Sequence, residues 1–322
     1  MTDERKNELG NTFILKDAAP QALAALEIEE LCFLIRTAEY LIETSAFAGG
    51  NLPEKPPLFR AALIALLKAS DALFIAYDAA TEYPYIDPEA RMWLFSRQEF
   101  ALGAQAFYAQ SIPLEIRKIY RDEIEGAFAE LHIMGIEKVL LDNGHQFVEF
   151  HRDDLLPPPD WSGTPKVSIP VSNPQLMFAM IRFFQTLHAK TGDEDRAQRL
   201  GQLEDAMLDA ITSARFLVPM RVVKAQPSPA DPQGALSLEK GDTLEFARIS
   251  DASGKQFQPA FTDWIEFGKA FDQNVWSGNV ASCDDLFALA QSMNGVVINQ
   301  SGLPLLINDT TRQKINQRRG LA

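Results

Sequence analysis

The segment His151-Arg152-Asp153-Asp154 comes nearest to a catalytic or metal-binding site in residue type. An imidazole beside two carboxylates supplies the groups that metal ions and general acid–base chemistry use. The four residues are consecutive, however, and no second His or Cys follows at a ligand spacing such as His-x-x-x-His. The pattern favours a charged strand end over a metal site. The remaining histidines, His132, His145 and His188, are expected at packing or surface positions.

The two cysteines, Cys32 and Cys283, are not expected to pair. Cys32 lies in an apolar helical stripe, where a free cysteine behaves as a small hydrophobic residue. Cys283 lies near a predicted helix start, which can lower the pKa of a thiol, but Asp284 and Asp285 oppose that effect. We therefore expect no disulfide scaffold and no reactive thiol. Such cysteine usage favours a reducing compartment.

The motifs of common enzyme classes are missing from the sequence. It contains no Gly-x-Gly-x-x-Gly, no phosphate-loop Gly-Lys-Ser/Thr and no Gly-x-Ser-x-Gly nucleophile elbow. Acid pairs such as Asp153-Asp154 lie in segments expected at the surface, whereas a two-carboxylate mechanism needs opposed groups in a cleft. The sequence therefore predicts a protein that is not an enzyme and that uses no cofactor and no metal.

Aromatic and polar residues at strand ends are the candidates for an interaction surface. Thr262, Asp263 and Trp264 follow one predicted strand, and Trp93 and Ser96 occupy similar positions earlier in the chain. An exposed tryptophan in a first helical turn suits a protein contact, because aromatic side chains dominate the binding energy of interfaces. Core packing is the alternative interpretation of these rings. We predict that the five residues contribute to a surface for a protein or peptide.

Charge and hydropathy limit the partners. A formal net charge of −14 disfavours nucleic acid and anionic membranes. Residues 1–160 carry 27 acidic and 14 basic side chains, whereas residues 161–322 carry 17 and 16. The N-terminus lacks the apolar core of a signal peptide, and the apolar runs fall far short of the ~20 residues that span a membrane. We expect a cytoplasmic protein. The uneven charge is interpreted first as divergent solvated surface; the alternative is that the acidic half faces a basic partner or orients the molecule in an assembly.

Four blocks of residues recur in one order, which predicts a tandem duplication. A helix with Cys32-Phe33-Leu34-Ile35-Arg36 recurs as Phe178-Ala179-Met180-Ile181-Arg182. A helix leading into a strand, an aspartate turn leading into a second strand, and a helix followed by a hairpin then recur in turn. The paired segments are 63–77 with 203–219, 87–96 with 251–262, and 124–150 with 286–307. The fold expected is α+β (α/β-like): two homologous modules, each a helix pair, a mixed sheet with helices packed on it and a C-terminal hairpin.

Local signals set the caps and turns of each copy. Ser96 and Glu99 have the spacing of a capping box, in which each side chain accepts a backbone N–H of the other residue. The second copy lacks the acid, because Ile265 stands in its place. Asp142-Asn143-Gly144 and the segment Asn299 to Gly302 are predicted hairpin turns, since Asn-Gly tolerates positive φ angles.

Proline-rich stretches mark the boundaries. Pro157-Pro158-Pro159 cannot continue a helix or a central strand, so the seam between copies is predicted there. The segment from Lys224 to Thr243 is predicted to be a loop inserted into the second copy. The predicted organisation is an N-terminal tail at residues 1–20, a module at 21–156, a linker at 157–170, a second module at 171–315 and a basic tail at 316–322.

The second copy resembles the N-terminal domain of the SseB family. The resemblance lies in Phe216-Leu217-Val218-Pro219, in the segment from Asp251 to Phe261-Thr262, and in Gly295-Val296-Val297-Ile298-Asn299 with its short hairpin. It covers about residues 214–315 and departs from the family at Gln300, where a proline is expected. The first copy resembles a more diverged member. The resemblance implies a bacterial protein with this fold and supplies no enzyme activity, cofactor or catalytic residue.

Three functional hypotheses follow from these patterns. The favoured one is a non-enzymatic, SseB-like protein that binds a protein or peptide, at sheet edges or at the helix starts after Phe95 and Phe261. The alternative is an enzyme or small-molecule sensor whose site lies between the modules and includes His151 and Arg152. A third is a structural unit that serves only assembly.

Overall fold

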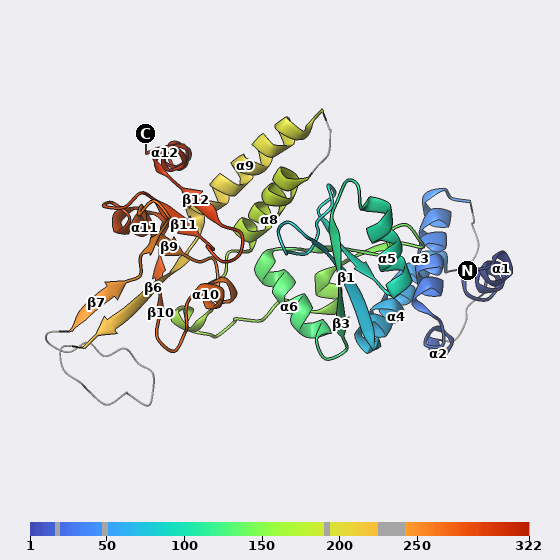
Figure 1. Ribbon diagram of the computed structural model, residues 1–322. Helices are drawn as coiled ribbons and strands as arrows, with labels where there is room; N and C mark the ends of the chain where they lie inside the picture. The colour runs from blue at the N-terminus through green and yellow to red at the C-terminus, as the bar shows by residue number, and fades with distance from the viewer. Residues whose placement is uncertain (17–19, 47–50, 190–193, 225–241, 322) are drawn as a thin grey trace. The chain divides into compact units, whose positions relative to one another are not determined.

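The computed structural model describes residues 1–16, 20–46, 51–189, 194–224 and 242–321. Within these ranges the chain forms two compact units, one made essentially of the residues up to Pro159 and the other of those from Asp160 onward. Each unit combines β-strands with packed helices, which confirms the predicted α+β class (Figure 1). The predicted inserted loop, Lys224 to Thr243, lies largely outside the described residues.

The first unit begins with helices and then builds one sheet. Its helical elements before the sheet are α1 (Asp3–Leu9), the π-helical η1 (Gly10–Ile14), α2 (Pro20–Leu23), α3 (Ile28–Glu43), the 3-10 helix η2 (Leu52–Glu54) and α4 (Lys55–Ala69). The sheet segment comprises β1 (Ala72–Asp78), β2 (Arg91–Phe95), α5 (Gln98–Tyr108), β3 (Leu114–Tyr120), α6 (Ile124–Met134), β4 (Lys138–Leu141), β5 (Val148–His151) and α7 (Arg152–Leu155).

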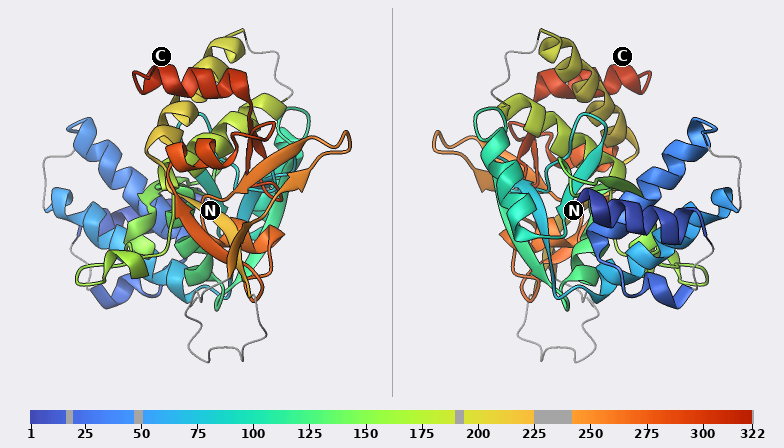
Figure 2. Two further views of the ribbon diagram at one scale, coloured as in Figure 1. Left: turned by 90° about the vertical axis from the view of Figure 1, so that its left-hand side faces the viewer. Right: turned by 90° about the vertical axis from the view of Figure 1, so that its right-hand side faces the viewer.

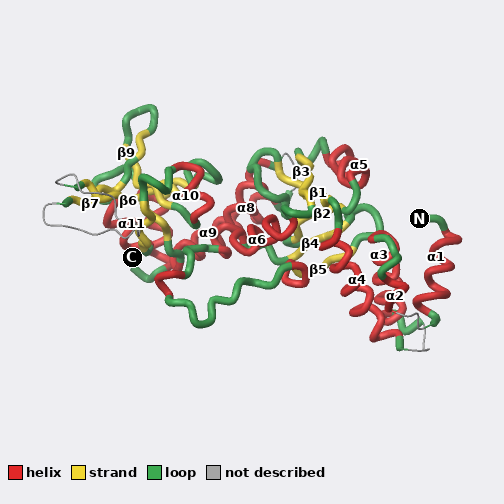
Figure 3. The backbone as a smooth tube through the Cα atoms, turned by 90° about the horizontal axis from the view of Figure 1, so that it is seen from below, coloured by secondary structure: helices red, strands yellow, loops and turns green. Residues whose placement is uncertain are grey.

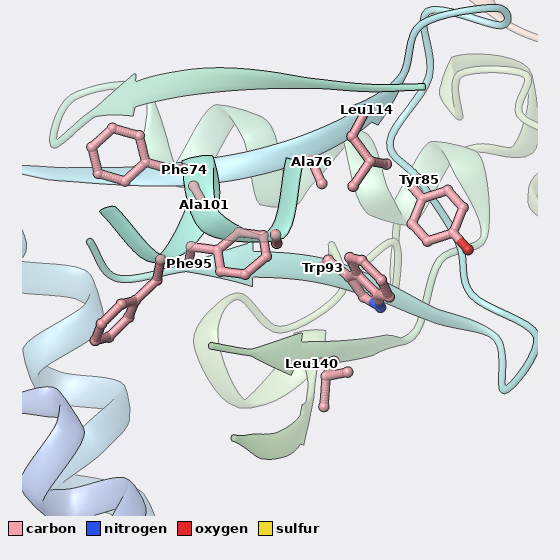
Figure 4. Packing of buried hydrophobic residues seen from close by; sticks show 10 residues of the cluster. Phe74, Ala76, Tyr85, Trp93, Phe95, Ala101, Leu114 and Leu140 are labelled. Atoms are coloured by element: carbon pink, nitrogen blue, oxygen red, sulfur yellow. The ribbon is translucent and has the colours of Figure 1, made fainter. Parts of the chain in front are cut away.

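The five strands of the first unit are arranged in the order β3-β1-β2-β4-β5. The pair β2–β4 is parallel, and the other neighbouring pairs are antiparallel. One face of this sheet packs against α5 and buries aromatic side chains from several strands (Figure 4). The cluster comprises Phe74, Ala76, Tyr85, Trp93, Phe95, Phe100, Ala101, Ala104, Leu114 and Leu140.

The helix α3 illustrates why the first unit folds as it does. Glu27 and Glu30 form a capping box that satisfies backbone N–H groups at the helix start. The apolar positions that follow recur at helical spacing, and the buried ones are Leu31, Cys32, Leu34, Ile35 and Ala38. Such a stripe forms a helix only because it packs on a core.

The N-terminal segment is folded rather than a tail. The helix α1 and the π-helical turn after it bury Leu9, Phe13 and Ile14. Arg5 on α1 donates to Glu30 on α3 at 2.6 Å, and α1 lies beside α3 (Figure 3). The boundary predicted at residue 20 was set by charge and polarity, which concealed these three apolar side chains.

The second unit repeats this plan with additions. Its elements are η3 (Lys166–Ser168), α8 (Pro174–His188), α9 (Arg196–Ser213), β6 (Phe216–Val223), β7 (Thr243–Phe246), β8 (Ile249–Ser250), β9 (Gln256–Ala260), α10 (Trp264–Ala270), β10 (Ser277–Ala281), α11 (Cys283–Leu289), β11 (Val296–Ile298), β12 (Leu305–Ile307) and α12 (Asp309–Arg318). Two sheets, β10-β6-β7 and β12-β11-β9-β8, are joined by a bridge between Leu217 and Phe261.

The two units share strand order and pairing directions. Through the bridge, the main strands of the second unit follow the order β10-β6-β9-β11-β12, which matches β3-β1-β2-β4-β5 position by position. The pair β9–β11 is parallel, as β2–β4 is, and β10–β6 and β11–β12 are antiparallel, as β3–β1 and β4–β5 are. In each unit a pair of long helices directly precedes the sheet, α3 and α4 in the first and α8 and α9 in the second, and helices occupy the same two connections. This agreement is what two copies of one module require.

The basic C-terminal residues belong to a helix. The helix α12 packs against α9 within the second unit (Figure 2). Arg318 pairs with Asp205 and Asp209 on α9, and Arg319 pairs with Asp284 at the start of α11. The acidic partners of the predicted tail are therefore in its own unit.

Candidate functional site

Trp93, predicted to lie at an interaction surface, is part of the core. Its side chain is only 4% exposed and packs edge-on against Tyr85, with ring centroids 4.9 Å apart. The indole Nε1 donates to Asp87 Oδ2 at 3.1 Å. The same carboxylate accepts from Arg91 Nε at 2.8 Å. From its buried position, Trp93 therefore stabilises the turn before β2 through its hydrogen bond to Asp87.

Ser96 does not form the predicted capping box. The residue before α5 is Arg97, and its side chain makes no cap. Ser96 instead donates twice to Asp142, from its backbone N–H to Oδ1 and from Oγ to Oδ2, each at 2.7 Å. Asp142 lies at the end of β4, 46 residues further along the chain, and this long-range partner replaces the local one that sequence spacing suggests.

Thr262 and Asp263 are buried as well, with exposures of 0% and 3%. Thr262 N–H donates to Asn299 Oδ1 at 3.0 Å, and Asn299 Nδ2 donates to Thr262 Oγ1 at 2.9 Å. The Thr262 hydroxyl donates to Asp263 Oδ2 at 2.7 Å. Asp263 Oδ1 accepts the N–H groups of Ile265 and Glu266, both at 2.9 Å, and so caps α10.

The pairs Ser96–Asp142 and Thr262–Asn299 occupy equivalent places, and we call each a strand-end latch. Asp142 N–H donates to the Leu94 carbonyl and Asn299 N–H to the Ala260 carbonyl, both at 2.9 Å. Asp142 and Asn299 both adopt a φ of 54°, a conformation in which Asp and Asn are enriched. Each latch ties the end of one parallel strand to the end of the next.

The latches differ in charge. Burial raises the pKa of Asp142, although the hydrogen bonds from Ser96 act in the opposite direction. The second latch has the neutral Asn299 at that position, and its carboxylate is Asp263, which follows the hydroxyl residue. Each unit thus holds one buried carboxylate against one hydroxyl, at different positions.

Trp264 is the only one of the three predicted residues of the second unit with partial exposure. Its ring packs at 5.1 Å from that of Phe267, within a cluster that includes Phe261 and Phe271. A Cβ built on Gly278 would lie 2.7 Å from Trp264 Cη2. Glycine on β10 is therefore what allows the indole to lie against that strand.

The histidine-containing segment of the first unit serves local structure. His151 Nδ1 accepts the N–H of Asp153 and caps α7. Arg152 donates to the carbonyls of Leu131 and Ile136 at 3.0 and 2.9 Å. His132 lies 3.8 Å from the Asp153 carboxylate, a proximity that sequence spacing does not reveal. Among the residues described, no group of three or more His, Cys, Asp or Glu side chains is arranged to hold a metal ion.

Both cysteines are free and buried. Burial raises the pKa of the Cys32 thiol, and the nearby charge of Asp142 adds to the effect. Burial likewise raises the pKa of Cys283 to about 11, although Arg319 acts in the opposite direction. Neither thiol has the electropositive, accessible surroundings of a reactive cysteine.

The sequence predicted binding at sheet edges but did not reveal the edge strands β3 and β10. β3 is outermost in the sheet of the first unit, and β10 is outermost beside β6 in the second. Within the described ranges, β3 packs extensively only against β1 and α5, and β10 only against β6 and α11. The outer edge of each strand is open, and an open edge presents unpaired backbone groups to another chain.

The ladder shows which backbone groups of β3 point outward. Arg121 N–H donates to the Asp71 carbonyl at 3.1 Å, and Ala79 N–H donates to the Pro113 carbonyl at 2.9 Å. In an antiparallel pair, residues that exchange hydrogen bonds alternate with residues whose N–H and C=O point away. Counted along the register, the odd-numbered residues of β3 bond β1 and the even-numbered residues point outward.

Side chains of the same unit close both ends of this outward row. Gln105 Nε2, on α5, donates to the Leu114 carbonyl at 2.6 Å. At the other end, Tyr120 N–H donates to Glu123 Oε2 at 2.8 Å. The two residues between these ends keep their outward N–H and C=O groups without a partner in the part of the chain that the structure describes.

We call these two residues, Ile116 and Lys118, the β3 window. Their four open groups are enough for two residues of an added antiparallel strand, because each directly opposed pair exchanges two hydrogen bonds. The first four residues of the strand, Leu-Glu-Ile-Arg, alternate apolar and polar, which is a sequence signal for a strand. β3 does not recur in the sequence of the second unit, because the equivalent strand, β10, has the unrelated sequence Ser-Gly-Asn-Val-Ala.

The second unit has a window at the same place. Leu217 exchanges both backbone hydrogen bonds with Phe261, the residue after β9, so the residues on either side of Leu217 bond β10. Gly278 and Val280 on β10 therefore point outward, and we call them the β10 window. Val280 is paired with Leu217, as Lys118 is paired with Phe74 in the other sheet.

The end of this window is closed in the same way as that of the β3 window. Ser282 N–H donates to Asp285 Oδ2 at 2.8 Å. This contact corresponds to the one between Tyr120 and Glu123, three residues apart in both units. An added strand therefore cannot use the backbone N–H at this end of either window.

Comparison with known proteins identifies part of the second unit. Residues 195–308 match the SseB protein N-terminal domain. No curated protein and no solved structure was found to match the chain. None of the described helices is long and apolar enough to cross a membrane.

Proposed function

We propose that this protein, which contains an SseB protein N-terminal domain at residues 195–308, is not an enzyme and binds extended protein or peptide segments by β-strand addition. The observation that carries the proposal is the pair of open windows. Each unit has one at the same place in its sheet; side chains close both ends of the β3 window and the Ser282 end of the β10 window. Strand addition is a common mode of peptide recognition, in which backbone hydrogen bonds supply affinity and alternate side chains supply specificity.

The number of open groups sets the strength of this binding. Four hydrogen bonds at a net ~1 kcal/mol each amount to ~4 kcal/mol, which corresponds to a dissociation constant of about 1 mM. Ordering the peptide reduces this further. A partner must therefore gain most of its affinity from side chains beside the window, so the windows are expected to select particular sequences.

We also propose that the two units are diverged copies of one module. The shared strand order, the equivalent latches with equal φ angles and the matching closure at one end of the two windows support this duplication. A chance arrangement would have no reason to repeat hydrogen bonds to the same backbone positions.

The setting and the partners of the protein belong to the same proposal. Two buried, free cysteines suit a reducing cytoplasm. The net charge of −14 supports a protein partner rather than nucleic acid or an anionic membrane. Self-association through a window is the homotypic form of the same mechanism, and light scattering distinguishes it from binding to another chain.

Selection of peptides against edge-blocked variants tests the proposal. Proline at Lys118 or Val280 removes one outward N–H while leaving the inner ladder intact, and both side chains are exposed. A library of random peptides is displayed and selected on the wild-type protein, and the selected peptides are then measured against Lys118→Pro and Val280→Pro. The matched controls are Lys118→Ala and Val280→Ala, which retain the N–H groups.

Strand addition predicts that selected peptides lose affinity for a proline variant and bind the matching alanine variant far better. Peptides that bind the double proline variant as tightly as the wild-type protein would refute it. Circular dichroism and thermal unfolding of each variant verify that the fold is retained.

A further inference from the structure

We infer that the β3 window selects an extended, antiparallel peptide with an acidic side chain opposite Lys118 and an apolar side chain opposite Ile116. This inference rests on the proposed strand addition and adds the chemistry of the partner. It commits to a protein segment with the pattern acidic–any–apolar, and its support is the local charge and the apolar surface on either side of the window.

Among the described residues, Lys118 is the basic side chain of β3 that forms no ion pair. Its side chain is exposed, and its Nζ lies 4.5 Å from the centre of the Tyr120 ring. No carboxylate lies within ion-pair distance of Lys118 among the described residues. The other basic residues here are engaged: Arg117 pairs with Glu115 at 3.2 Å and stacks on Tyr77 at 4.0 Å, and Arg121 pairs with Asp71 at 2.9 Å.

The apolar side of the window comes from β3 and α5. Ile116 is partly buried and packs against the cluster beneath α5. Leu102 on α5 is 46% exposed and lies three residues before Gln105, on the same side of the helix. Gln105 reaches over the edge to the outward carbonyl of Leu114, so that side of α5 faces the open edge. An apolar side chain of the peptide opposite Ile116 would therefore cover Ile116 and approach Leu102.

The geometry of the window fixes the spacing of the two peptide side chains. Ile116 and Lys118 are two residues apart, so their side chains lie on one face of the sheet. Peptide residues directly opposite them also lie two apart and on that face, at a distance at which cross-strand pairs interact. In an antiparallel strand the acidic residue comes first, which gives the core Glu-x-Leu.

The preference for an acidic side chain depends on the nearby charge of Lys118 and not on the net charge of the first half of the chain. Residues 1–160 carry 27 acidic and 14 basic side chains, and their summed field opposes an acidic peptide. At physiological ionic strength charges beyond about 8 Å are largely screened, so the direct pair with Lys118 decides the preference. Without that lysine, the same edge would favour a neutral or basic strand.

The β10 window provides an internal contrast. Its residues are Gly278 and Val280, which carry no charge, and Trp264 occupies the space where a side chain at 278 would lie. The position equivalent to Lys118 is Val280. Acid selection is therefore a property of the first unit alone.

Fluorescence anisotropy with two labelled nonapeptides tests the inference. The probes are Thr-Val-Thr-Glu-Thr-Leu-Thr-Val-Thr and the same peptide with Lys in place of Glu, measured at ~0.15 M salt, where screening leaves only near pairs effective. The full-length protein carries Val280→Pro throughout, so that only the β3 window has all its outward groups. Lys118, Lys118→Ala, Lys118→Glu and Lys118→Pro are compared in that background.

We expect the Glu probe to bind better than the Lys probe to the protein with Lys118. Changing an attractive cross-strand pair into a repulsive one should weaken the Glu probe about tenfold in Lys118→Glu and favour the Lys probe there. Lys118→Ala should fall between the two, and Lys118→Pro should bind neither probe.

Equal binding of both probes, lost in Lys118→Pro, would overturn the acidic preference and leave strand addition standing. Binding that survives in Lys118→Pro, or no binding of either probe, would overturn this inference, and undiminished binding in Lys118→Pro would also contradict addition at this edge. If Lys118→Pro does not fold, the exchange of preference between Lys118 and Lys118→Glu still decides the question.

Discussion

Exchanging the polar residues of the two strand-end latches should change the stability of the first unit little and destabilise the second. Asp142→Asn gives the first latch the chemistry of the second, since the amide oxygen can accept the Ser96 N–H and the amide nitrogen can donate to Ser96 Oγ. Asn299→Asp places a carboxylate in the second latch, where Thr262 already donates its only hydroxyl proton to Asp263. The first change preserves two hydrogen bonds. The second places two buried carboxylates, Asp263 and the new one at position 299, beside a single hydroxyl proton, that of Thr262.

The magnitudes follow from burial and from hydrogen-bond satisfaction. Asp142→Asn should stay within ~1 kcal/mol of the wild-type stability at pH 7, because it substitutes one buried hydrogen-bonded pair for another. Asn299→Asp should cost ~3–5 kcal/mol, the range for an uncompensated buried charge. Asn299 Nδ2 also lies 3.2 Å from Met177 Sδ, a contact that the carboxylate would lose.

The pH dependence of the Asp142 contribution has a defined sign. Because burial raises the pKa of Asp142 in the folded state, the folded protein holds this proton more tightly than the unfolded chain. The corresponding stability is fully present below the unfolded pKa and is lost as the pH rises through the folded pKa. Asp142→Asn should remove this acid-side contribution, so that the difference between the two proteins changes across that window and is constant at neutral pH.

Hydrogen exchange followed by mass spectrometry measures the two units separately, since peptides from the β4–β5 and β11–β12 hairpins report on each latch. Faster exchange is expected in the β11–β12 hairpin of Asn299→Asp and little change in the β4–β5 hairpin of Asp142→Asn. Equal, large losses of protection in both variants, or none in Asn299→Asp, would refute the equivalence of the latches and the role of the buried charge.

Three further outcomes test individual contacts. Gly278→Ala should cost ~1–3 kcal/mol in urea unfolding and shift the fluorescence of Trp264, because the new Cβ would lie 2.7 Å from the indole; unchanged stability would show that the ring moves freely. Trp93→Phe should cost ~1–2 kcal/mol, since the hydrogen bond to Asp87 is lost inside the core, and a neutral effect in thermal unfolding would contradict this. Cys283 should react slowly with iodoacetamide at neutral pH and faster as the pH approaches its pKa of about 11; rapid alkylation of the folded protein at pH 7 would contradict its burial.

The sequence predicted the central strands and the order of elements because the core constrains both. Positions such as Phe95 and Phe261 recur since each fills the same place between a sheet and a helix, and their burial preserves apolar character. The aspartate turns before β2 and β9 recur because each carboxylate accepts the backbone N–H four residues further along the chain, from Arg91 to Asp87 and from Lys255 to Asp251.

The sequence could not reveal features that depend on distant residues or on weakly constrained ones. Ser96 has the local spacing of a cap, but Asp142 competes for its hydroxyl from 46 residues away. Trp93 was predicted at a surface because its burial depends on how Tyr85 and Asp87 fold over it. The edge strands β3 and β10 were missed because their sequences differ between the copies, whereas the edge strands β5 and β12 recur as the second strands of the predicted hairpins.

The backbone amides of β3 provide the most direct test of the open window. Amide exchange measured residue by residue by NMR should alternate in the free protein, with Ile116 and Lys118 exchanging quickly and Arg117 and Ile119 protected. On addition of the Glu-containing nonapeptide, the amides of Ile116 and Lys118 should become protected, while those of their neighbours should change little. Protection of all four amides in the free protein, or peptide binding that leaves Ile116 and Lys118 unchanged, would contradict the account.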